Sequence, residues 1–502
     1  MRSVGLLSLA LTLCAEGVTR AADSPWLYGL HWYRTDGDVE AITGGKGVWL
    51  LETLMTFDGS WNADSQKSKM EIAASRGHTI ICRIQPRWGF AVPHENEMPV
   101  YLDAVRATAE KLKHVCRHWQ IGNEMNNPIE FGGGNLAPAT YVDRFKRIRA
   151  AIKEVQSPLG EQVVLLGPPT SFATYYLLGM LINLDPEDVD GIAIHAYGVD
   201  PDLAVVNSLA NFRAAYAEQL AVIDQEGFRY KPVFITEFDR CTNPTDTAPQ
   251  ENTSSQFLHR AYGELDAWNS NPANHPITTA IWFVYPNDSN WSCFSLLRHK
   301  SGPRGQDVNL WDAFQFATTK NYTAGVSPAA LDVSTTLIER EFPWQTLPPS
   351  DGFTISNIGA GTLNYMLSED ADWLSVSPES GASVGKADAI RITYDFGDRP
   401  SAIYEATIDV TATGAALSPA TITVRVDLLP HRGDLDRDGD VDQTDFGLFQ
   451  ACLNPPGHVQ QDPACRFARL DGDVDVDLND IGIFTNCMSG PNVPSNPDCG
   501  FD

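Results

Sequence analysis

Short apolar runs alternate with longer amphipathic stretches between Trp26 and about Tyr322. Some runs are almost wholly apolar, such as Val163–Leu166 and Val233–Ile235, which is typical of parallel strands buried on both faces. This part of the chain is therefore predicted to form a parallel sheet. The predicted strands are Trp26–Tyr33, Gly47–Met55, His78–Pro86, Cys116–Gly122, Gln162–Gly167, Asp190–His195, Pro232–Glu237 and Thr278–Tyr285.

Between these runs, apolar residues recur at three- and four-residue spacing, which predicts amphipathic helices. The predicted helices are Pro99–Leu112, Thr140–Val155, Leu209–Ile223, Ser254–Trp268 and Leu310–Thr318. Eight strands, each followed by a helix or a loop over roughly 300 residues, match the size and order of a (β/α)8 TIM barrel. A doubly wound open sheet is the alternative. The strand count of eight, with no Gly-rich phosphate loop after the first strand, favours a barrel over residues 22–322.

The pattern changes after the predicted barrel. Residues 323–350 contain four prolines and show no sustained period, so we expect a linker there. Residues 351–429 show two-residue alternation, as in Ile390–Tyr394 and Thr421–Val426, with turn residues between the runs. That pattern predicts a small β-sandwich.

Residues 431–502 contain an internal repeat with an offset of 35 residues. Asp445–Phe449 (DFGLF) aligns with Asp480–Phe484 (DIGIF), and Cys452 aligns with Cys487. Because Cys465 and Cys499 follow at similar spacing, each repeat could close its own disulfide.

The first repeat carries acidic residues at positions 1, 3, 5, 7, 9 and 12 of a twelve-residue loop, with Gly439 at position 6. This is the spacing of an EF-hand calcium loop, with Asp in place of Glu at position 12. In the second repeat Arg469 replaces the first ligand and Val474 replaces the turn glycine, so calcium affinity there should be lower. The predicted Ca²⁺ ligands are Asp434, Asp436, Asp438, Asp440, Asp442 and Asp445, then Asp471, Asp473, Asp475 and Asp480.

Charge and the N-terminus add constraints on partners and location. The formal net charge of −28 disfavours nucleic acid and anionic membrane surfaces as partners. Residues 1–21 combine Arg2, an apolar run and small residues before Ala22, which predicts a signal peptide and a secreted protein. No later stretch is long enough to predict membrane insertion.

Eight cysteines remain once the leader is removed, an even number that permits disulfides in an exported protein. Cys241 and Cys293 follow neighbouring strands and could pair. Cys82 and Cys116 could also pair, or could be buried thiols.

Two glutamates end strand-like runs: Glu124 closes the fourth and Glu237 closes the seventh. Because the carboxyl ends of barrel strands face the active site, both side chains should enter one site. Two facing carboxylates can hydrolyse a glycosidic bond, and their separation decides between retention and inversion.

The motifs Ile121-Gly122-Asn123-Glu124 and Ile235-Thr236-Glu237 resemble the hallmark of clan A of the glycoside hydrolases, a set of retaining (β/α)8 enzymes that includes cellulases, mannanases, xylanases and β-galactosidases. The resemblance implies that Glu124 is the acid/base and Glu237 the nucleophile. It also implies that Asn123 binds the sugar 2-hydroxyl.

Further residues at strand ends are expected to bind substrate under the same resemblance. Tyr197 would hold Glu237 ionised, and Trp282 would form an aromatic platform under the sugar. Arg83 would lower the pKa of the nucleophile, or would pair with an internal carboxylate such as Glu52. The full predicted set is Asn123, His195, Tyr197, Trp282, His31, Trp32 and Arg83. Three loop aromatics could form further subsites or could anchor loops: Trp88, Tyr285 and Trp291.

Two resemblances concern the accessory regions. The segment Ala371–Gly381, with Trp373 and Pro378, resembles the BACON β-sandwich domains, and Trp373 would be either a core residue or a sugar contact. The tandem calcium loops resemble a type I dockerin, which implies a cohesin-like partner.

Together these features predict a secreted retaining hydrolase that cleaves β-linked polysaccharide or oligosaccharide by double displacement and needs no cofactor for catalysis. The alternative is a non-catalytic protein that uses the barrel and the repeat only for binding. The sugar, the linkage, and the choice between endo and exo action stay open.

Overall fold

The computed structural model describes residues 23–198, 205–240, 251–286, 294–297, 310–343, 348–397, 399–496 and 499. The predicted signal peptide and the Cys241–Cys293 pair lie outside these ranges, as does Trp291. The chain divides into two compact units that meet between Ser327 and Pro328, and each is described by itself. Within the described residues, no helix has the length and apolar character needed to cross a bilayer.

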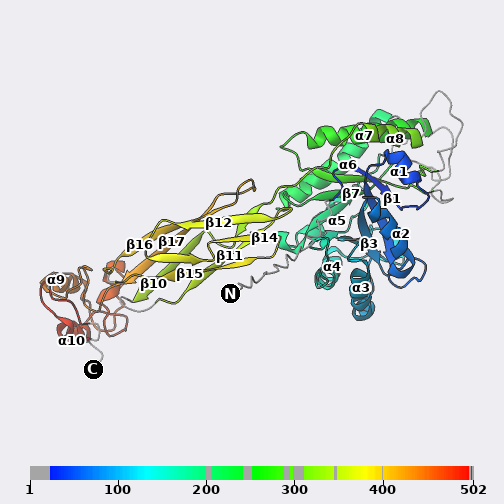
Figure 1. The fold of residues 1–502 in the computed structure, drawn as a ribbon. Coiled ribbons are helices and arrows are strands. Elements are labelled where there is room, and N and C mark those ends of the chain that lie inside the picture. Colours follow the sequence, from blue (N-terminus) through cyan, green and yellow to red (C-terminus); the bar gives the residue numbers. More distant parts are fainter. Residues whose placement is uncertain are drawn as a thin grey trace, which may run out of the picture. The chain divides into compact units, whose positions relative to one another are not determined.

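The first unit is a closed barrel of eight parallel strands in sequential order (Figure 1). Each strand falls where an apolar run predicted it, so the predicted TIM barrel is confirmed and the open sheet is excluded. The strands are β1 Tyr28–His31, β2 Trp49–Met55, β3 Thr79–Gln85, β4 His118–Ile121, β5 Val163–Leu166, β6 Gly191–His195, β7 Val233–Phe238 and β8 Ile277–Trp282.

Helices surround the barrel, and three of them were not predicted. The helix α2 is largely polar, and α5 is apolar almost throughout, so neither shows a clear amphipathic period. The third, α1, is only six residues long. The helices are α1 Asp38–Thr43, α2 Ala63–Ser75, α3 Met98–Leu112, α4 Pro138–Lys153, α5 Thr174–Leu181, α6 Val205–Gln225, α7 Glu251–Asn269 and α8 Leu310–Thr319.

Strand alternation divides the barrel residues between two cores. One set packs inside the barrel, and the other set packs against the helices. The inward apolar set is Trp49, Leu51, Ile81, Leu165, Ala193, Phe234 and Ile281. Two residues further along their strands, Thr53, Arg83 and His195 share the inward parity, so polar side chains replace apolar ones at the carboxyl end.

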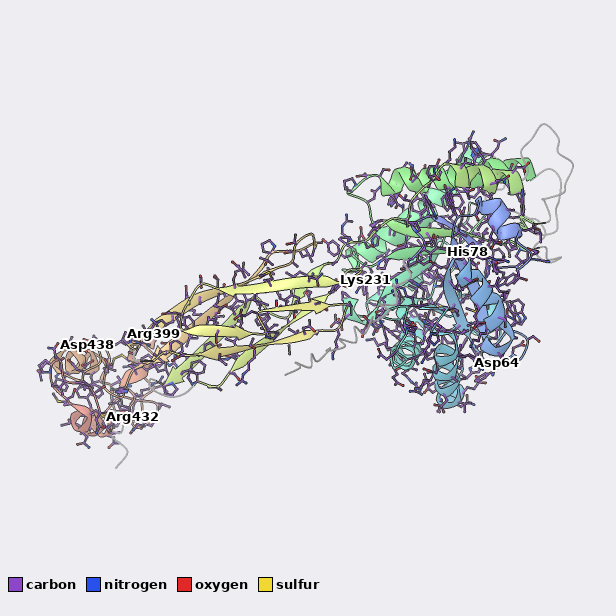
Figure 2. All side chains as sticks on the ribbon, viewed as in Figure 1. Asp64, His78, Lys231, Arg399, Arg432 and Asp438 are labelled. Atoms are coloured by element: carbon purple, nitrogen blue, oxygen red, sulfur yellow. A yellow bond between two sulfur atoms is a disulfide. The ribbon has the colours of Figure 1, made fainter. Side chains whose placement is uncertain are left out.

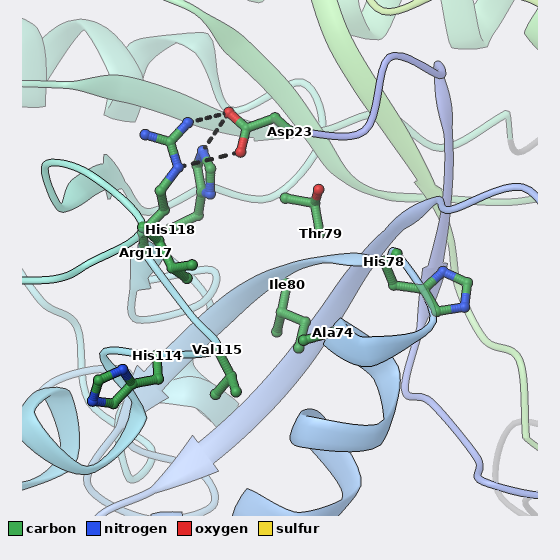
Figure 3. A pocket seen from close by; sticks show the side chains of 11 residues that line it. Asp23, Ala74, His78, Thr79, Ile80, His114, Val115, Arg117 and His118 are labelled. Carbon is green, nitrogen blue, oxygen red and sulfur yellow. Dashed lines mark hydrogen bonds and ion pairs between the residues drawn. The ribbon is translucent and has the colours of Figure 1, made fainter. Parts of the chain in front are cut away.

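The opposite end of the barrel contains a cavity of about 100 Å³ near the starts of β3 and β4 (Figure 3). Asp23 forms an ion pair with Arg117 there and lies 3.4 Å from His118 Nε2. Asp23 and Arg117 compensate each other's charge at the amino-terminal end of the barrel, where residues contribute to stability rather than to catalysis. Nearby, Cys82 and Cys116 form a disulfide, which resolves the alternative left open by the sequence.

The second unit begins with a sandwich of a five-stranded and a four-stranded sheet. The predicted linker is wrong in part, because β9 and β10 lie inside residues 323–350. The strand β10 runs parallel to β17 at a sheet edge, where its final Pro343 is tolerated. The strands are β9 Leu331–Val333, β10 Leu337–Pro343, β11 Asp351–Asn357, β12 Leu363–Glu369, β13 Leu374–Ser377, β14 Ser380–Ser383, β15 Asp388–Tyr394, β16 Ile403–Thr411 and β17 Ala420–Leu429.

Trp373 belongs to the sandwich core. It is 4% exposed and stacks on Phe396 with ring centroids 5.1 Å apart. The alternative of a sugar contact at this residue is therefore wrong.

The C-terminal repeat forms two similar loop–helix units, with α9 Gln443–Cys452 and α10 Leu478–Cys487. Each helix starts with the same Asp capping box, at Asp442 and at Asp477. The predicted disulfides Cys452–Cys465 and Cys487–Cys499 are confirmed.

Each disulfide-closed segment bonds to the acidic loop of the other repeat. The backbone N–H of Asn454 donates to the Val476 carbonyl at 3.0 Å. Reciprocally, the N–H of Ser489 donates to the Val441 carbonyl at 3.0 Å. The cysteine-rich extensions therefore tie the two repeats together.

Candidate active site

Glu237 reaches the carboxyl end of the barrel through a register shift. Ile194 pairs with Ile235, but His195 pairs with Glu237, so one extra residue is accommodated in β7. Strict alternation from Phe234 would have directed Thr236 inward instead. The shift brings the Glu237 carboxylate level with the inward-facing His195.

Both oxygens of Glu237 accept hydrogen bonds. Arg83 Nη1 donates to Oε1 at 2.6 Å, and the Tyr197 hydroxyl donates to Oε2 at 2.5 Å. Burial opposes ionisation, but the electrostatic influence of His195 and Arg83 and the Tyr197 hydrogen bond outweigh it and lower the pKa of Glu237 to about 2. Burial, together with the Glu237 charge, raises the pKa of Tyr197 well above its usual value, so Tyr197 stays a donor.

Arg83 links several polar groups in the site. Its Nη1 also donates to Asn123 Oδ1 at 2.8 Å, and Nη2 donates to Thr53 Oγ1 at 2.9 Å. Nη2 lies 3.3 Å from His31 Nε2. Burial and the Arg83 charge lower the pKa of His31 well below its usual value, so a neutral His31 accepts this bond. Arg83 therefore pairs with Glu237, and Glu52 pairs instead with Lys69.

Glu124 lies just beyond β4 in an unusual backbone segment. Gly122 has φ 72°, and a Cβ there would approach the Ala91 carbonyl oxygen to 2.8 Å, so only glycine fits. Glu124 itself has φ 40°, a conformation that non-glycine residues adopt mainly where the surrounding structure enforces it. Its Oε1 lies 2.9 Å from His195 Nδ1, and its Oε2 accepts from Asn127 Nδ2 at 3.1 Å.

The two glutamates face one another across His195. One oxygen of each carboxylate and one His195 nitrogen all lie within 4.8 Å of one another. Such a group could hold a cation, but the Arg83 guanidinium already occupies Glu237 at 2.6 Å, and its charge disfavours a metal at the same place. The arrangement is suited to proton transfer and nucleophilic attack.

Trp282 was predicted to lie in the site, but the structure places its side chain elsewhere. It is 0% exposed, packs edge-on against Phe238 and donates from Nε1 to the Phe294 carbonyl at 2.8 Å. The predicted role as a sugar platform is therefore wrong, because Ile281 and not Trp282 has inward parity on β8. Phe283 lies beside the site, with its ring centroid 5.0 Å from that of His31.

Trp32 follows β1 in a positive-φ conformation and contacts His31 with ring centroids 4.6 Å apart. Tyr285, one of the three loop aromatics, is fully buried and is an anchor rather than a contact surface.

Two further carboxyl groups near the site were not predicted. Asn123 Nδ2 donates to Glu130 Oε1 at 3.4 Å. Burial raises the pKa of Glu130; the Glu124 charge raises this pKa further, and the Arg83 charge opposes the rise. Asp239 is 1% exposed, and burial and the Glu237 charge raise its pKa well above the usual value. Asp239 lies two residues after the predicted nucleophile, a proximity that could have indicated it. Glu130 has no such local signal.

The acidic loops of the C-terminal repeat gather carboxylate oxygens within 4.8 Å of one another. The backbone N–H groups of Arg437 and Gly439 lie near the Asp434 carboxylate, but both Asp434 oxygens are buried and neither makes a hydrogen bond of normal geometry. One oxygen of Asp440 and one oxygen of Asp475 are likewise buried without a partner. Asp438 lies outside these groups, and its Oδ1 accepts from the Asp440 N–H at 3.1 Å (Figure 2 labels it). The groups are Asp434, Asp436 and Asp445; Asp440, Asp442 and Asp445; Asp471, Asp477 and Asp480; and Asp473, Asp475 and Asp480.

Comparison with known proteins returns solved structures only. No family model matches the chain, and no curated protein matches it. A glucosidase from Croceicoccus marinus is 13% identical, with a TM-score of 0.44 over 74% of this chain and 97% of that one. The endoglucanase Cel5A from Pseudomonas stutzeri, in complex with cellobiose, is 14% identical, with a TM-score of 0.41 over 61% and 98%. A tri-modular GH5 (subfamily 4) endo-β-1,4-glucanase from Bacillus licheniformis is 12% identical, with a TM-score of 0.39 over 80% and 78%. Because these identities and TM-scores are low, the protein is described by its own structure, a (β/α)8 barrel with two facing carboxylates at its carboxyl end.

Proposed function

We propose that this protein is a retaining glycoside hydrolase that cleaves β-linked polysaccharide. The observation that carries the proposal is the approach of Glu124 and Glu237, whose facing oxygens lie within 4.8 Å. Carboxyl groups about 5–5.5 Å apart suit the retaining route, whereas inversion needs about 6.5–9.5 Å to fit a water.

The contacts divide the two roles. Glu237 is fixed as a carboxylate by Arg83 and Tyr197, which suits a nucleophile that attacks the anomeric carbon. Glu124 contacts His195 and Asn127 rather than the arginine that holds Glu237, and it faces Glu237 from the end of β4, which places it to give a proton to the leaving oxygen and later to take one from water. Asn123 presents its amide nitrogen while Arg83 holds its oxygen, so the nitrogen can donate to a sugar hydroxyl.

The test is hydrolysis of a panel of glucan, mannan, xylan and galactan, followed by NMR of the anomeric protons. The first product should carry the β configuration and should mutarotate afterwards. An initial α product would contradict the retaining route, and no hydrolysis across the panel would favour the non-catalytic alternative.

We also propose that the protein is exported. Three disulfides among the described residues, one in the barrel and two in the C-terminal repeat, support an oxidising compartment.

We propose further that the C-terminal repeat binds Ca²⁺. Asp434 carries this proposal, because a buried carboxylate with two unpartnered oxygens is costly unless a cation compensates it. The neighbouring Asp436 and Asp445 supply further oxygen ligands, the type that Ca²⁺ prefers.

Asp434→Asn should weaken calcium binding at least about tenfold and remove most of the calcium-dependent rise in the melting temperature of the repeat. Calorimetric titration of the full chain with CaCl₂ and thermal unfolding with and without EDTA measure both effects. The matched control is Asp462→Asn, an exposed acidic residue of the same repeat that is not one of the predicted ligands, which should leave calcium affinity unchanged. Equal effects of the two substitutions would contradict the role given to Asp434.

We propose that the same repeat docks a cohesin-like protein. In support, α9 and α10 expose the apolar side chains of Leu448 and Leu478 at 45% and 78%. Calorimetry against a panel of cohesin modules, with and without Ca²⁺, tests this.

A further inference from the structure

Each of the first three strand-to-helix connections contributes one tryptophan to a continuous row of rings. Trp32 follows β1, Trp61 lies between β2 and α2, and Trp88 follows β3. The ring centroids of Trp32 and Trp61 are 5.6 Å apart, and those of Trp61 and Trp88 are 5.8 Å apart. We call these three residues the tryptophan row.

The tryptophan row begins at the candidate active site and ends in solvent. Trp32 contacts His31, and His31 lies 3.3 Å from the arginine that pairs with Glu237. Exposure increases outward: Trp32 and Trp61 are half-buried, and Trp88 is 49% exposed. Trp88 therefore leaves a large apolar surface exposed at the outer end of the row, which is unfavourable unless a ligand covers it.

The row lies on the side of the nucleophile. Arg83, His31 and Phe283 connect Glu237 to Trp32, whereas Glu124 contacts His195 and Asn127, from β6 and the loop after β4. The acid/base must face the leaving group, so the leaving part of the substrate lies toward β4 to β6. The part that stays on the nucleophile, the glycone, then extends toward the loops after β1 to β3.

We infer that the tryptophan row binds the glycone part of a linear polysaccharide, so that the enzyme cleaves bonds inside the chain and works poorly on short substrates. The inference rests on the proposed glycosidase function and extends it from the glycosidic bond that is cleaved to the length of polysaccharide that is bound. The face of a tryptophan ring matches the apolar face of a sugar ring, and its large area supplies binding energy at little cost in entropy. Because neighbouring rings in the row are turned by 45° and 80°, each ring would contact a separate sugar rather than form part of one flat platform. A row of rings, rather than a closed pocket, accommodates a chain that continues past the site.

The experiment compares Trp88→Ala with Phe316→Ala on oligosaccharides of two to six units from the polysaccharide that is hydrolysed, labelled at the reducing end with ¹⁸O. Phe316 is the matched control, because it is a 48% exposed aromatic on α8, away from the strand ends. Trp88→Ala should lower kcat/KM on the hexamer about tenfold and should lower kcat/KM on an aryl β-monoglycoside, which is too short to reach Trp88, by a much smaller factor, whereas Phe316→Ala should change neither. In the wild type, most cleavage should leave several units on the glycone side.

A binding measurement separates failure of this inference from failure of the proposed function. Calorimetry of cello-, manno-, xylo- and galacto-hexaose against Glu237→Gln, with and without Trp88→Ala, needs no turnover. Loss of hexamer affinity in the double variant supports the row even if hydrolysis were absent. Unchanged affinity and an unchanged hexamer-to-monoglycoside ratio of kcat/KM would overturn it, even in an active glycosidase.

Discussion

Replacement of Glu237 by glutamine is expected to lower kcat on the polysaccharide by on the order of 10⁴-fold or more, with the fold preserved. Glutamine fills the same space, and its single oxygen can still accept from Arg83 while its amide NH2 faces the Tyr197 hydroxyl, but it cannot form the glycosyl–enzyme bond. Steady-state kinetics and circular dichroism of the variant measure the two parts. The control is Glu52→Gln, another buried barrel carboxylate, which pairs with Lys69 and should lose stability but keep kcat.

The corresponding change at Glu124 separates acid from nucleophile. Glu124→Gln should lower kcat on polysaccharide about 10²–10⁴-fold, the usual contribution of a general acid. An aryl glycoside with a leaving group that needs no protonation should lose much less in its first chemical step, seen as a burst of phenol. Glu237→Gln should show no burst. If Glu237→Gln gave the burst and Glu124→Gln did not, the two roles would be exchanged.

The barrel was predictable because its information is local. A run such as Val163–Leu166 is typical of a strand buried on both faces, and a chain with eight such runs can adopt only a few architectures. The same reasoning placed Glu124 and Glu237 at the same end of the barrel, and the structure has Glu124 three residues after β4 and Glu237 at the end of β7.

Predictions that depend on which face a residue occupies were less secure. A single residue separates Ile281, which packs inside the barrel, from the buried Trp282, which packs against Phe238. The inward position of Glu237 itself depends on a register shift that strict alternation would not give. Glu130 approaches Asn123 through a loop whose path no local pattern specifies. Strand β10 was missed because its final proline and its charged residues are typical of a linker, yet they are compatible with a sheet edge.

Replacement of Arg83 by methionine is expected to destabilise the barrel by about 3–5 kcal/mol and to move the acid limb of kcat/KM to higher pH. Both effects arise because Glu237 would stay buried without its cation. A carboxyl group whose pKa is lowered from 4.5 to about 2 on folding contributes stability above pH 4.5, and that contribution is lost as the pH falls toward 2. Without Arg83, Glu237 takes up a proton at a higher pH and stops acting as a nucleophile sooner.

Two further variants make the Arg83 prediction specific. Arg83→Lys keeps a charge but cannot bond Glu237, Asn123 and Thr53 together, so its acid limb should move less than that of Arg83→Met while kcat still falls. Arg106→Met removes an exposed ion pair with Glu154 and should change stability by less than about 1 kcal/mol without moving the pH profile. Thermal unfolding and pH–rate profiles of the three variants measure these effects. An unmoved acid limb in Arg83→Met would mean that Glu237 does not depend on this cation for its charge, and the nucleophile would then have to be kept ionised by Tyr197 and His195.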